Sequence, residues 1–151
     1  MSKYKLLVSA CLLGENCKYN GSNNRNEKVL DLEKYFYLVP VCPECFGGLP
    51  IPREPSEIKD GGVYSKSGND VTDAFVDGAE KTLYIAEENN CFLALLKERS
   101  PSCGCGKIYD GSFTSTVIDG NGVTADLLLN NGITIYGESR IDDLIDDYGE
   151  E

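Results

Sequence analysis

The sequence contains no histidine. This absence excludes Ser-His and Cys-His nucleophile pairs, zinc sites that need an imidazole ligand, and the commonest general base of enzymes. Any chemistry must therefore use cysteine, carboxylate, serine, lysine, arginine or tyrosine side chains.

The sequence also lacks a long apolar run. No stretch approaches the roughly 18 residues that span a bilayer. Residues 1–5 lead directly into Leu6-Leu-Val8, which is too short for a signal-peptide core and has no small-residue cleavage site. We therefore expect a cytoplasmic protein with no membrane partner.

Basic residues are in the minority, because 14 lysines and arginines face 25 aspartates and glutamates and give a formal charge of −11. Such a charge repels the phosphates of nucleic acids and anionic membrane surfaces. DNA is excluded as an expected partner, and tRNA is disfavoured.

The length and composition are those of one ordinary globular domain, which we expect to span residues 1–151. Hydrophobic residues make up 41% of the chain and charged residues 26%. Seven cysteines are an odd number, so a disulfide framework cannot use all of them. In a reducing compartment, clustered cysteines more often bind metal or perform chemistry.

Short apolar segments alternate with segments of helical periodicity along the chain. This alternation predicts an α/β fold, a single-domain three-layer sandwich with a mostly parallel, Rossmann-like sheet. Strands are expected over 5–10, 37–41, 91–96 and 133–136, and helices over 27–35, 72–88, 124–130 and 141–148.

Three further local features can be predicted. Pro40 places its strand at an edge of the sheet, because proline cannot donate to a strand ladder. Residues 43–55 carry four prolines and two adjacent glycines, so we expect an irregular loop there. A small hairpin is expected around 67–69.

Cysteines follow three of the predicted strands at the point where each strand ends. Cys11 follows the first strand, Cys42-Pro-Glu-Cys45 the second, and Ser100-Pro-Ser-Cys-Gly-Cys105 closely follows the third. Sites in parallel sheets form beyond the carboxyl ends of the strands. We therefore expect cysteines from three distant segments to meet at one edge of the sheet.

Such a group of thiols suits a cubane iron–sulfur cluster, which takes thiolate ligands supported by backbone N–H groups. Three ligands instead of four would leave one iron open to substrate. The spacing also allows a zinc site built from Cys42, Cys45, Cys103 and Cys105, or a redox pair at Cys42 and Cys45. Cysteine is often only a small buried hydrophobe, our interpretation of Cys91, and Cys17 is expected to be an inert, partly exposed thiol.

Three motifs, in this order, resemble those of the thiouracil desulfurase family. They are Ser9-Ala-Cys-Leu-Leu-Gly14 with Tyr19-Asn-Gly21, Val41-Cys-Pro-Glu44 with Gly47-Gly-Leu-Pro-Ile-Pro-Arg53, and Lys97-Glu-Arg-Ser-Pro-Ser-Cys-Gly104. Together they span most of the chain and are highly specific, although any one alone would not be.

The resemblance implies a 4Fe-4S cluster held by Cys11, Cys42 and Cys103, with Cys45 as a rival to Cys42. It implies desulfuration of a small thiolated pyrimidine, of the 2-thiouracil or 4-thiouracil type, to uracil and sulfide without net redox change. Glu44 and Ser100 match the family's proposed catalytic carboxylate and hydroxyl.

Residues beside these motifs are candidates for contact with substrate. They are Tyr19, Arg53 and Lys97. Desulfurases that act on thiolated tRNA resemble this family but have an additional domain, which we do not expect here. We therefore expect substrates the size of a free base or nucleoside, and a monomer or homodimer. Two alternatives remain, an electron-transfer or binding module whose cluster has four protein ligands, and a zinc-stabilised structural protein.

Overall fold

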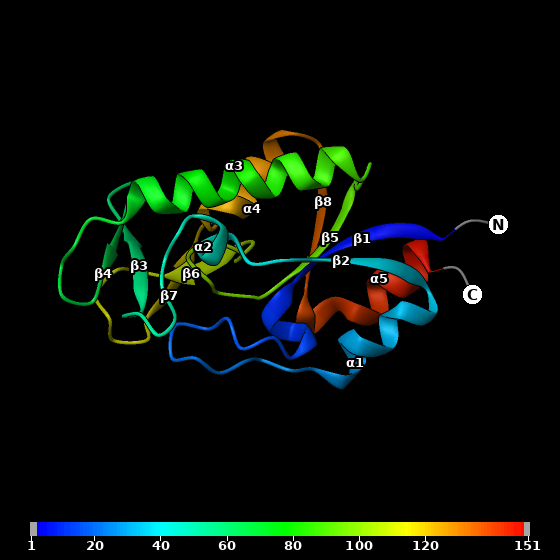
Figure 1. Cartoon of the computed structure of the whole chain (residues 1–151), viewed down its shortest axis with the longest axis horizontal. Coiled ribbons are helices and arrows are strands. Elements are labelled where there is room, and N and C mark those ends of the chain that lie inside the picture. Colours follow the sequence, from blue (N-terminus) through cyan, green and yellow to red (C-terminus); the bar gives the residue numbers. More distant parts are fainter. Residues whose placement is uncertain (1–2, 150–151) are drawn as a thin grey trace.

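The computed structural model describes residues 3–149 and is built around a parallel four-stranded sheet (Figure 1). The strand order is β2-β1-β5-β8. The bounds are β1 Tyr4–Ser9, β2 Phe36–Val41, β5 Leu93–Leu96 and β8 Thr134–Gly137. The α/β prediction is confirmed, and β2, which contains Pro40, lies at an edge as expected.

Helices cover both faces of this sheet. The first face carries α1 (Glu27–Leu30), which continues as a 3-10 turn, and α5 (Ile141–Tyr148). The second face carries α3 (Thr72–Glu88) and α4 (Val123–Asn130), which lie together along one side in Figure 1. Among residues 3–149, no helix has both the length and the apolarity that a membrane crossing requires.

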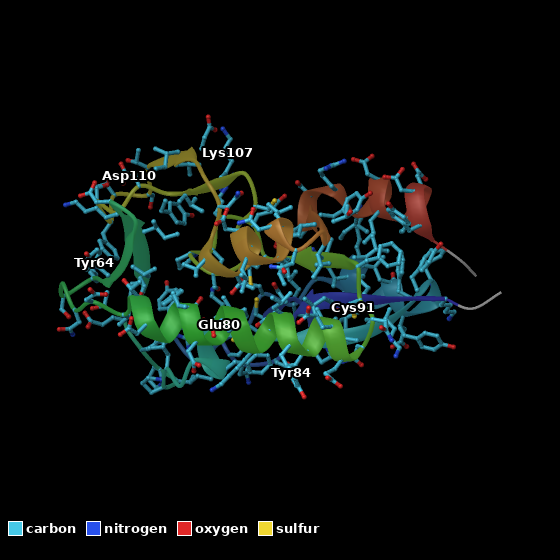
Figure 2. All side chains as sticks on the ribbon, turned by 90° about the horizontal axis from the view of Figure 1, so that it is seen from above. Tyr64, Glu80, Tyr84, Cys91, Lys107 and Asp110 are labelled. Carbon is cyan, nitrogen blue, oxygen red and sulfur yellow. The ribbon has the colours of Figure 1, made fainter. Side chains whose placement is uncertain are left out.

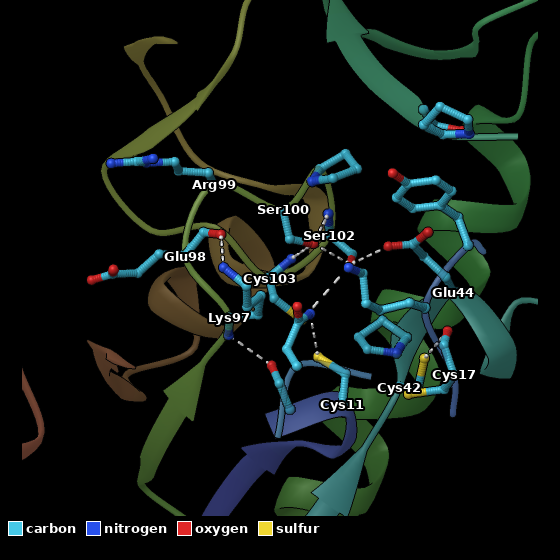
Figure 3. A pocket seen from close by; sticks show the side chains of 18 of the residues that line it. Cys11, Cys17, Cys42, Glu44, Lys97, Glu98, Arg99, Ser100, Ser102 and Cys103 are labelled. Carbon is cyan, nitrogen blue, oxygen red and sulfur yellow. Dashed lines mark hydrogen bonds between the residues drawn. The ribbon is translucent and has the colours of Figure 1, made fainter. Parts of the chain in front are cut away.

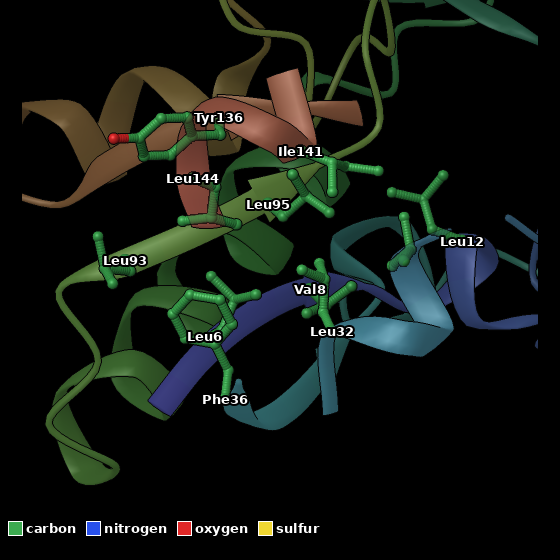
Figure 4. Packing of buried hydrophobic residues seen from close by; sticks show 11 residues of the cluster. Leu6, Val8, Leu12, Leu32, Phe36, Leu93, Leu95, Tyr136, Ile141 and Leu144 are labelled. Atoms are coloured by element: carbon green, nitrogen blue, oxygen red, sulfur yellow. The ribbon is translucent and has the colours of Figure 1, made fainter. Parts of the chain in front are cut away.

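The two cores follow from the alternation of side chains along the strands. Leu6 and Val8 of β1 pack on the first face with Phe36 and with Leu93 and Leu95 of β5 (Figure 4). Leu7 packs on the second face, with Ala94. Burying each such leucine stabilises the fold by about 1.5–3 kcal/mol. A one-residue slip of β1 would move these side chains to the opposite face and lose several of these contributions.

The irregular loop expected over 43–55 is present except at its start. It begins with the short helix α2 (Pro43–Phe46), because proline is well suited to the first helical position. The hairpin expected around 67–69 is formed, because Tyr64 and Asp70 make an antiparallel bridge and the Val71 N–H donates to the Val63 carbonyl at 2.9 Å. A hairpin of β3 (Ser56–Lys59) and β4 (Gly62–Ser65) precedes it. Asp60-Gly61 supplies the two left-handed residues of its turn.

A second hairpin was not predicted. It consists of β6 (Lys107–Tyr109) and β7 (Val117–Asp119), and it lies beside the first hairpin at one end of the molecule, where Figure 2 labels Tyr64 and Asp110. The buried carboxylate of Glu57 in β3 accepts hydrogen bonds from the backbone N–H groups of Gly111 (3.0 Å) and Phe113 (3.1 Å). This carboxylate ties the loop between β6 and β7 to the first hairpin.

Candidate metal centre

A cavity of about 470 Å³ opens at the carboxyl edge of the sheet. Its walls are the segments that follow β1, β2 and β5, completed by residues 17–19 and by Arg53 (Figure 3). The chain passes from β1 to one side for β2 and to the other side for β5. Sheets of this kind bind ligands at such a switch point.

Three of the predicted cysteine ligands line this cavity. Cys11 lies in the 3-10 turn after β1, Cys42 immediately follows β2, and Cys103 lies in the loop after β5. Cys45, on α2, is not among the lining residues. The structure therefore brings Cys11, Cys42 and Cys103 to one cavity and leaves Cys45 outside it.

The proposed four-cysteine zinc site is not formed. Within residues 3–149, no three histidine, cysteine, aspartate or glutamate side chains come close enough together to hold a single metal ion. Cys105 packs instead against the core of the second face. The ligands of a cubane bind separate iron atoms, so this finding concerns sites for a single ion.

Cys17 also lines the cavity, and the expectation of a partly exposed thiol was wrong because this side chain is buried. Its thiol hydrogen-bonds to Cys11 and Cys42, which lowers the pKa of Cys11 and lowers the pKa of Cys42 to about 6. The same hydrogen bonds raise the pKa of Cys17, which keeps its proton. Gly14, with φ of +95°, turns the chain back after Cys11. This glycine was the signal in the sequence that could have placed Cys17 near Cys11.

Other polar groups surround the cysteine sulfurs. Asn24 donates from Nδ2 to the Sγ of Cys11 at 3.3 Å, and the Oγ of Ser102 lies 3.7 Å from the Sγ of Cys103. Burial raises the pKa of Cys103 to about 12 in the protein without metal. Thiols from three loops with hydrogen-bond donors at their sulfurs form a donor set that fits an iron–sulfur cluster.

Glu44 lies in the first turn of α2 and faces the cavity. Its Oε1 accepts from Arg53 Nε at 3.3 Å and Nη2 at 3.2 Å, and its Oε2 accepts from Ser102 Oγ at 3.0 Å. The side chains of Glu44 and Arg53 are only 17% and 8% exposed. Nη2 of Arg53 also donates to the Cys17 carbonyl at 3.0 Å. Arg53, predicted to contact substrate, therefore has its guanidinium committed to the protein.

The structure distinguishes the two serines of the third loop. Ser100 lines the cavity, and its Oγ accepts from the backbone N–H groups of Ser102 (3.2 Å) and Cys103 (3.1 Å). Ser102, which the sequence did not single out, is the serine that contacts Glu44.

The remaining predicted contacts lie at the wall and mouth of the cavity. Tyr19 is 40% exposed and carries the Lys18 ammonium over its ring at 5.8 Å. Lys97 donates to Glu138 Oε1 at 3.2 Å and to the Glu98 carbonyl at 3.1 Å. Both side chains line the cavity, and the Lys97 charge lowers the pKa of Cys11 further.

The start of α4 fixes the loop that carries Ser102 and Cys103. The backbone N–H groups of Thr124 and Ala125 donate to the Ser102 carbonyl at 2.9 and 3.0 Å. These donors have no partner inside the helix, so the loop satisfies them. Gly122 permits this approach, because a Cβ there would lie 2.5 Å from the Ser102 oxygen.

The 2-thiouracil desulfurase family profile matches residues 6–140, which include all three motifs. The chain belongs to this family. The uncharacterized protein YbbK of Bacillus subtilis (strain 168) is 43% identical over 150 residues, 93% of this chain and 99% of that protein. Among solved structures, the 4Fe-4S-dependent thiouracil desulfidase TudS is 40% identical with a TM-score of 0.89, over 96% of this chain and 97% of that chain. The resemblance inferred from the motifs is confirmed.

Proposed function

We propose that this protein is an enzyme that removes sulfur from thiolated pyrimidines with the help of a 4Fe-4S cluster. The reaction is hydrolytic, gives a uracil-type product and sulfide, and involves no net redox change. Membership of the 2-thiouracil desulfurase family supports it, as does the likeness to TudS along nearly the whole chain. The observation that carries it is the meeting of three thiols from three loops at one cavity.

Cys11, Cys42 and Cys103 are the proposed cluster ligands. Cys42 is preferred to Cys45 because it lines the cavity and because its pKa, lowered to about 6, favours the thiolate that metals bind. Cys17 keeps its proton and lies beside the sulfurs of Cys11 and Cys42, whose pKa values it lowers. When bound, a cluster with three protein ligands supplies a Lewis-acidic iron for a thiocarbonyl sulfur.

The side chains of the cavity then act on water. Glu44 is the general base that accepts a proton from the attacking water, a role open to a carboxylate in a protein without histidine. Ser100, at the cavity wall, orients that water, and Tyr19 and Lys97 line the space for the pyrimidine. Arg53 holds Glu44 in place instead of binding substrate.

The cavity and the charge support the proposed substrate class. A volume of about 470 Å³ is within the range for small-molecule sites and suits a free base or nucleoside. A formal charge of −11 disfavours DNA and tRNA. Seven free cysteines support a reducing compartment, for which we propose the cytoplasm. We also propose that the protein is a monomer or homodimer.

Anaerobic reconstitution with iron and sulfide, followed by incubation with 2-thiouracil or 4-thiouracil, tests the proposal. The wild type should form uracil and sulfide, and Cys11→Ala, Cys42→Ala and Cys103→Ala should lose both activity and iron. Cys91→Ala is the matched control, because Cys91 lies near the amino end of β5, at the opposite edge of the sheet (Figure 2). A cluster that stays unperturbed by thiouracil would instead indicate an electron-transfer module.

A further inference from the structure

The sulfur of Cys11 accepts a hydrogen bond from the side-chain amide of Asn24 (Figure 3). Nδ2 of Asn24 lies 3.3 Å from this sulfur, and both side chains line the cavity. The distance is shorter than the 3.7 Å between Ser102 Oγ and the sulfur of Cys103. The Ser102 hydroxyl is also bonded to Glu44, at 3.0 Å. Of these two neutral groups, Asn24 is therefore the closer donor to a proposed ligand sulfur.

The backbone on both sides of Asn24 holds this donor in place. The Asn24 N–H donates to the Cys11 carbonyl at 2.9 Å, and the Asn26 N–H donates to the Leu12 carbonyl at 3.0 Å. Asn26 in turn caps α1, because its Oδ1 accepts from two backbone N–H groups of the first turn. The segment that carries Asn24 is thus fixed between the turn after β1 and the start of α1, and its amide is preorganised for the Cys11 sulfur.

The Asn24 donor carries no charge. The cation nearest to it in function is Lys97, which lines the same cavity but has its ammonium paired with Glu138 at 3.2 Å. The Asn24 amide can therefore be replaced without leaving an unpaired charge. Hydrogen bonds to ligand sulfurs draw electron density away from the sulfur and are among the factors that set the reduction potential of an iron–sulfur cluster.

We propose that Asn24 is a positioning residue that acts through the Cys11 sulfur, raises the reduction potential of the bound cluster and strengthens the binding of the thiocarbonyl sulfur to its iron. The inference rests on the proposed function and deepens its substrate-binding step. By drawing electron density from Cys11, the amide makes the iron a stronger Lewis acid. Asn24 itself exchanges no proton and no electron.

The test replaces the Asn24 amide with side chains of similar size. Asn24→Leu removes the donor, and Asn24→Asp places a carboxylate beside the sulfur. Both variants keep the backbone hydrogen bond to the Cys11 carbonyl. Anaerobic redox titration of the reconstituted proteins, followed by visible absorption, should give the highest potential for the wild type, a lower one for Asn24→Leu and the lowest for Asn24→Asp.

Turnover should follow the same order as the potentials. Loss of a hydrogen-bond partner of a metal ligand typically costs about 10- to 100-fold in metal affinity or activity. We therefore expect kcat/KM for 2-thiouracil to fall about tenfold or more in Asn24→Leu. Asn24→Gln keeps an amide, so it should recover part of both the potential and kcat/KM.

A competing role for Asn24 is to hold its loop against Cys11 by packing alone. That role predicts lower thermal stability and lower iron content in each Asn24 variant, with no ordered change in potential. The matched control is Asn23→Leu, because Asn23 lies in the same loop, outside the cavity, and donates from Nδ2 to Asn16 Oδ1 at 2.8 Å. The potential and kcat/KM of Asn23→Leu should equal those of the wild type.

Nitrogen-15 spectra of asparagine-labelled apoprotein test the hydrogen bond without a cluster. The side-chain signal of Asn24 can be identified by its loss in Asn24→Leu. This signal should shift in Cys11→Ala, which removes the acceptor, and should stay in place in Cys91→Ala.

Each outcome bears on the proposal. Equal potentials in the wild type, Asn24→Leu and Asn24→Asp, the reverse order, an equal shift in Asn23→Leu, or an unshifted Asn24 signal would overturn it. A wild type that binds a cluster but forms no uracil would overturn the proposed function instead, and the order of potentials would still decide whether Asn24 acts on the cluster. A wild type that binds no cluster would overturn both.

Discussion

Replacing Gly78 of α3 with alanine should displace the helix that carries Cys42 and Glu44. A Cβ at position 78 would lie 1.9 Å from the carbonyl oxygen of Pro43, where ordinary contact begins near 3.4 Å. Gly47, at the other end of α2, makes the reciprocal contact, because its Cβ would lie 2.0 Å from the Ala74 oxygen. Both neighbours are backbone atoms, so no side-chain rotation relieves the overlap, and α2 must move by about 1.5 Å.

The stability change combines two opposing effects. Alanine in a helix interior is favoured over glycine by about 1 kcal/mol. Overpacking costs about 1–3 kcal/mol, and a clash with rigid backbone belongs at the upper end of that range. The expected net loss for Gly78→Ala is about 2 kcal/mol, which lowers Tm by about 4–8 °C for a chain of this size.

Thermal unfolding of the apoprotein and iron content after anaerobic reconstitution are the two measurements. Gly78→Ala should retain less iron than wild type, because Cys42 is displaced with α2. Gly48→Ala is the control. Its φ of +89° strains an alanine, but no atom lies within 4 Å of the added Cβ, so α2 is not displaced. Equal stability and full iron in Gly78→Ala, or equal iron loss in both variants, would refute the argument.

The remaining predictions concern the ion pair, the thiols and the second hairpin. Arg53→Met leaves the Glu44 side chain without its buried partner and should cost about 3 kcal/mol in urea unfolding, while Arg25→Met, at an exposed pair, should be neutral; equal effects would contradict this. In metal-free protein near neutral pH, iodoacetamide should modify Cys42 (pKa about 6) before Cys45 (pKa about 11), because the thiolate is the reactive form. Peptide mass spectrometry measures the order of modification, and the reverse order would contradict these pKa values. Glu57→Ala should free the loop between β6 and β7 and speed its proteolysis; an unchanged cleavage rate would rule out this anchoring role.

Much of the fold was predictable because it depends on local patterns. The apolar runs of β1 and β5 and the helical spacing of α3 have the periods of their elements, and Pro40 marks an edge strand. The turn around 67–69 was predictable too, and Tyr64 and Asp70 pair across it. The hairpin of β3 and β4 was missed because its Asp60-Gly61 turn signal was not weighed. The second hairpin was missed because its strands are short and β7 is exposed throughout.

The candidate site also has a part that could be predicted from the sequence and a part that could not. The sequence was enough to predict that its cysteines meet at one edge of the sheet, since each of Cys11, Cys42 and Cys103 follows a strand that could be recognised. The roles of Ser102 and Arg53 could not be derived, because each depends on a side chain from another segment, and both meet at Glu44.

The order of strands in the sheet also determines when the protein can receive iron. β1 lies between β2 and β5, so the thiols that follow these strands are not held together until β5 has paired beside β1. A nascent chain still lacking β5 has no completed cavity, even though Cys11 and Cys42 have already emerged. If Cys11, Cys42 and Cys103 hold the cluster as proposed, cluster insertion would have to wait until most of the polypeptide has been synthesised and its sheet has formed.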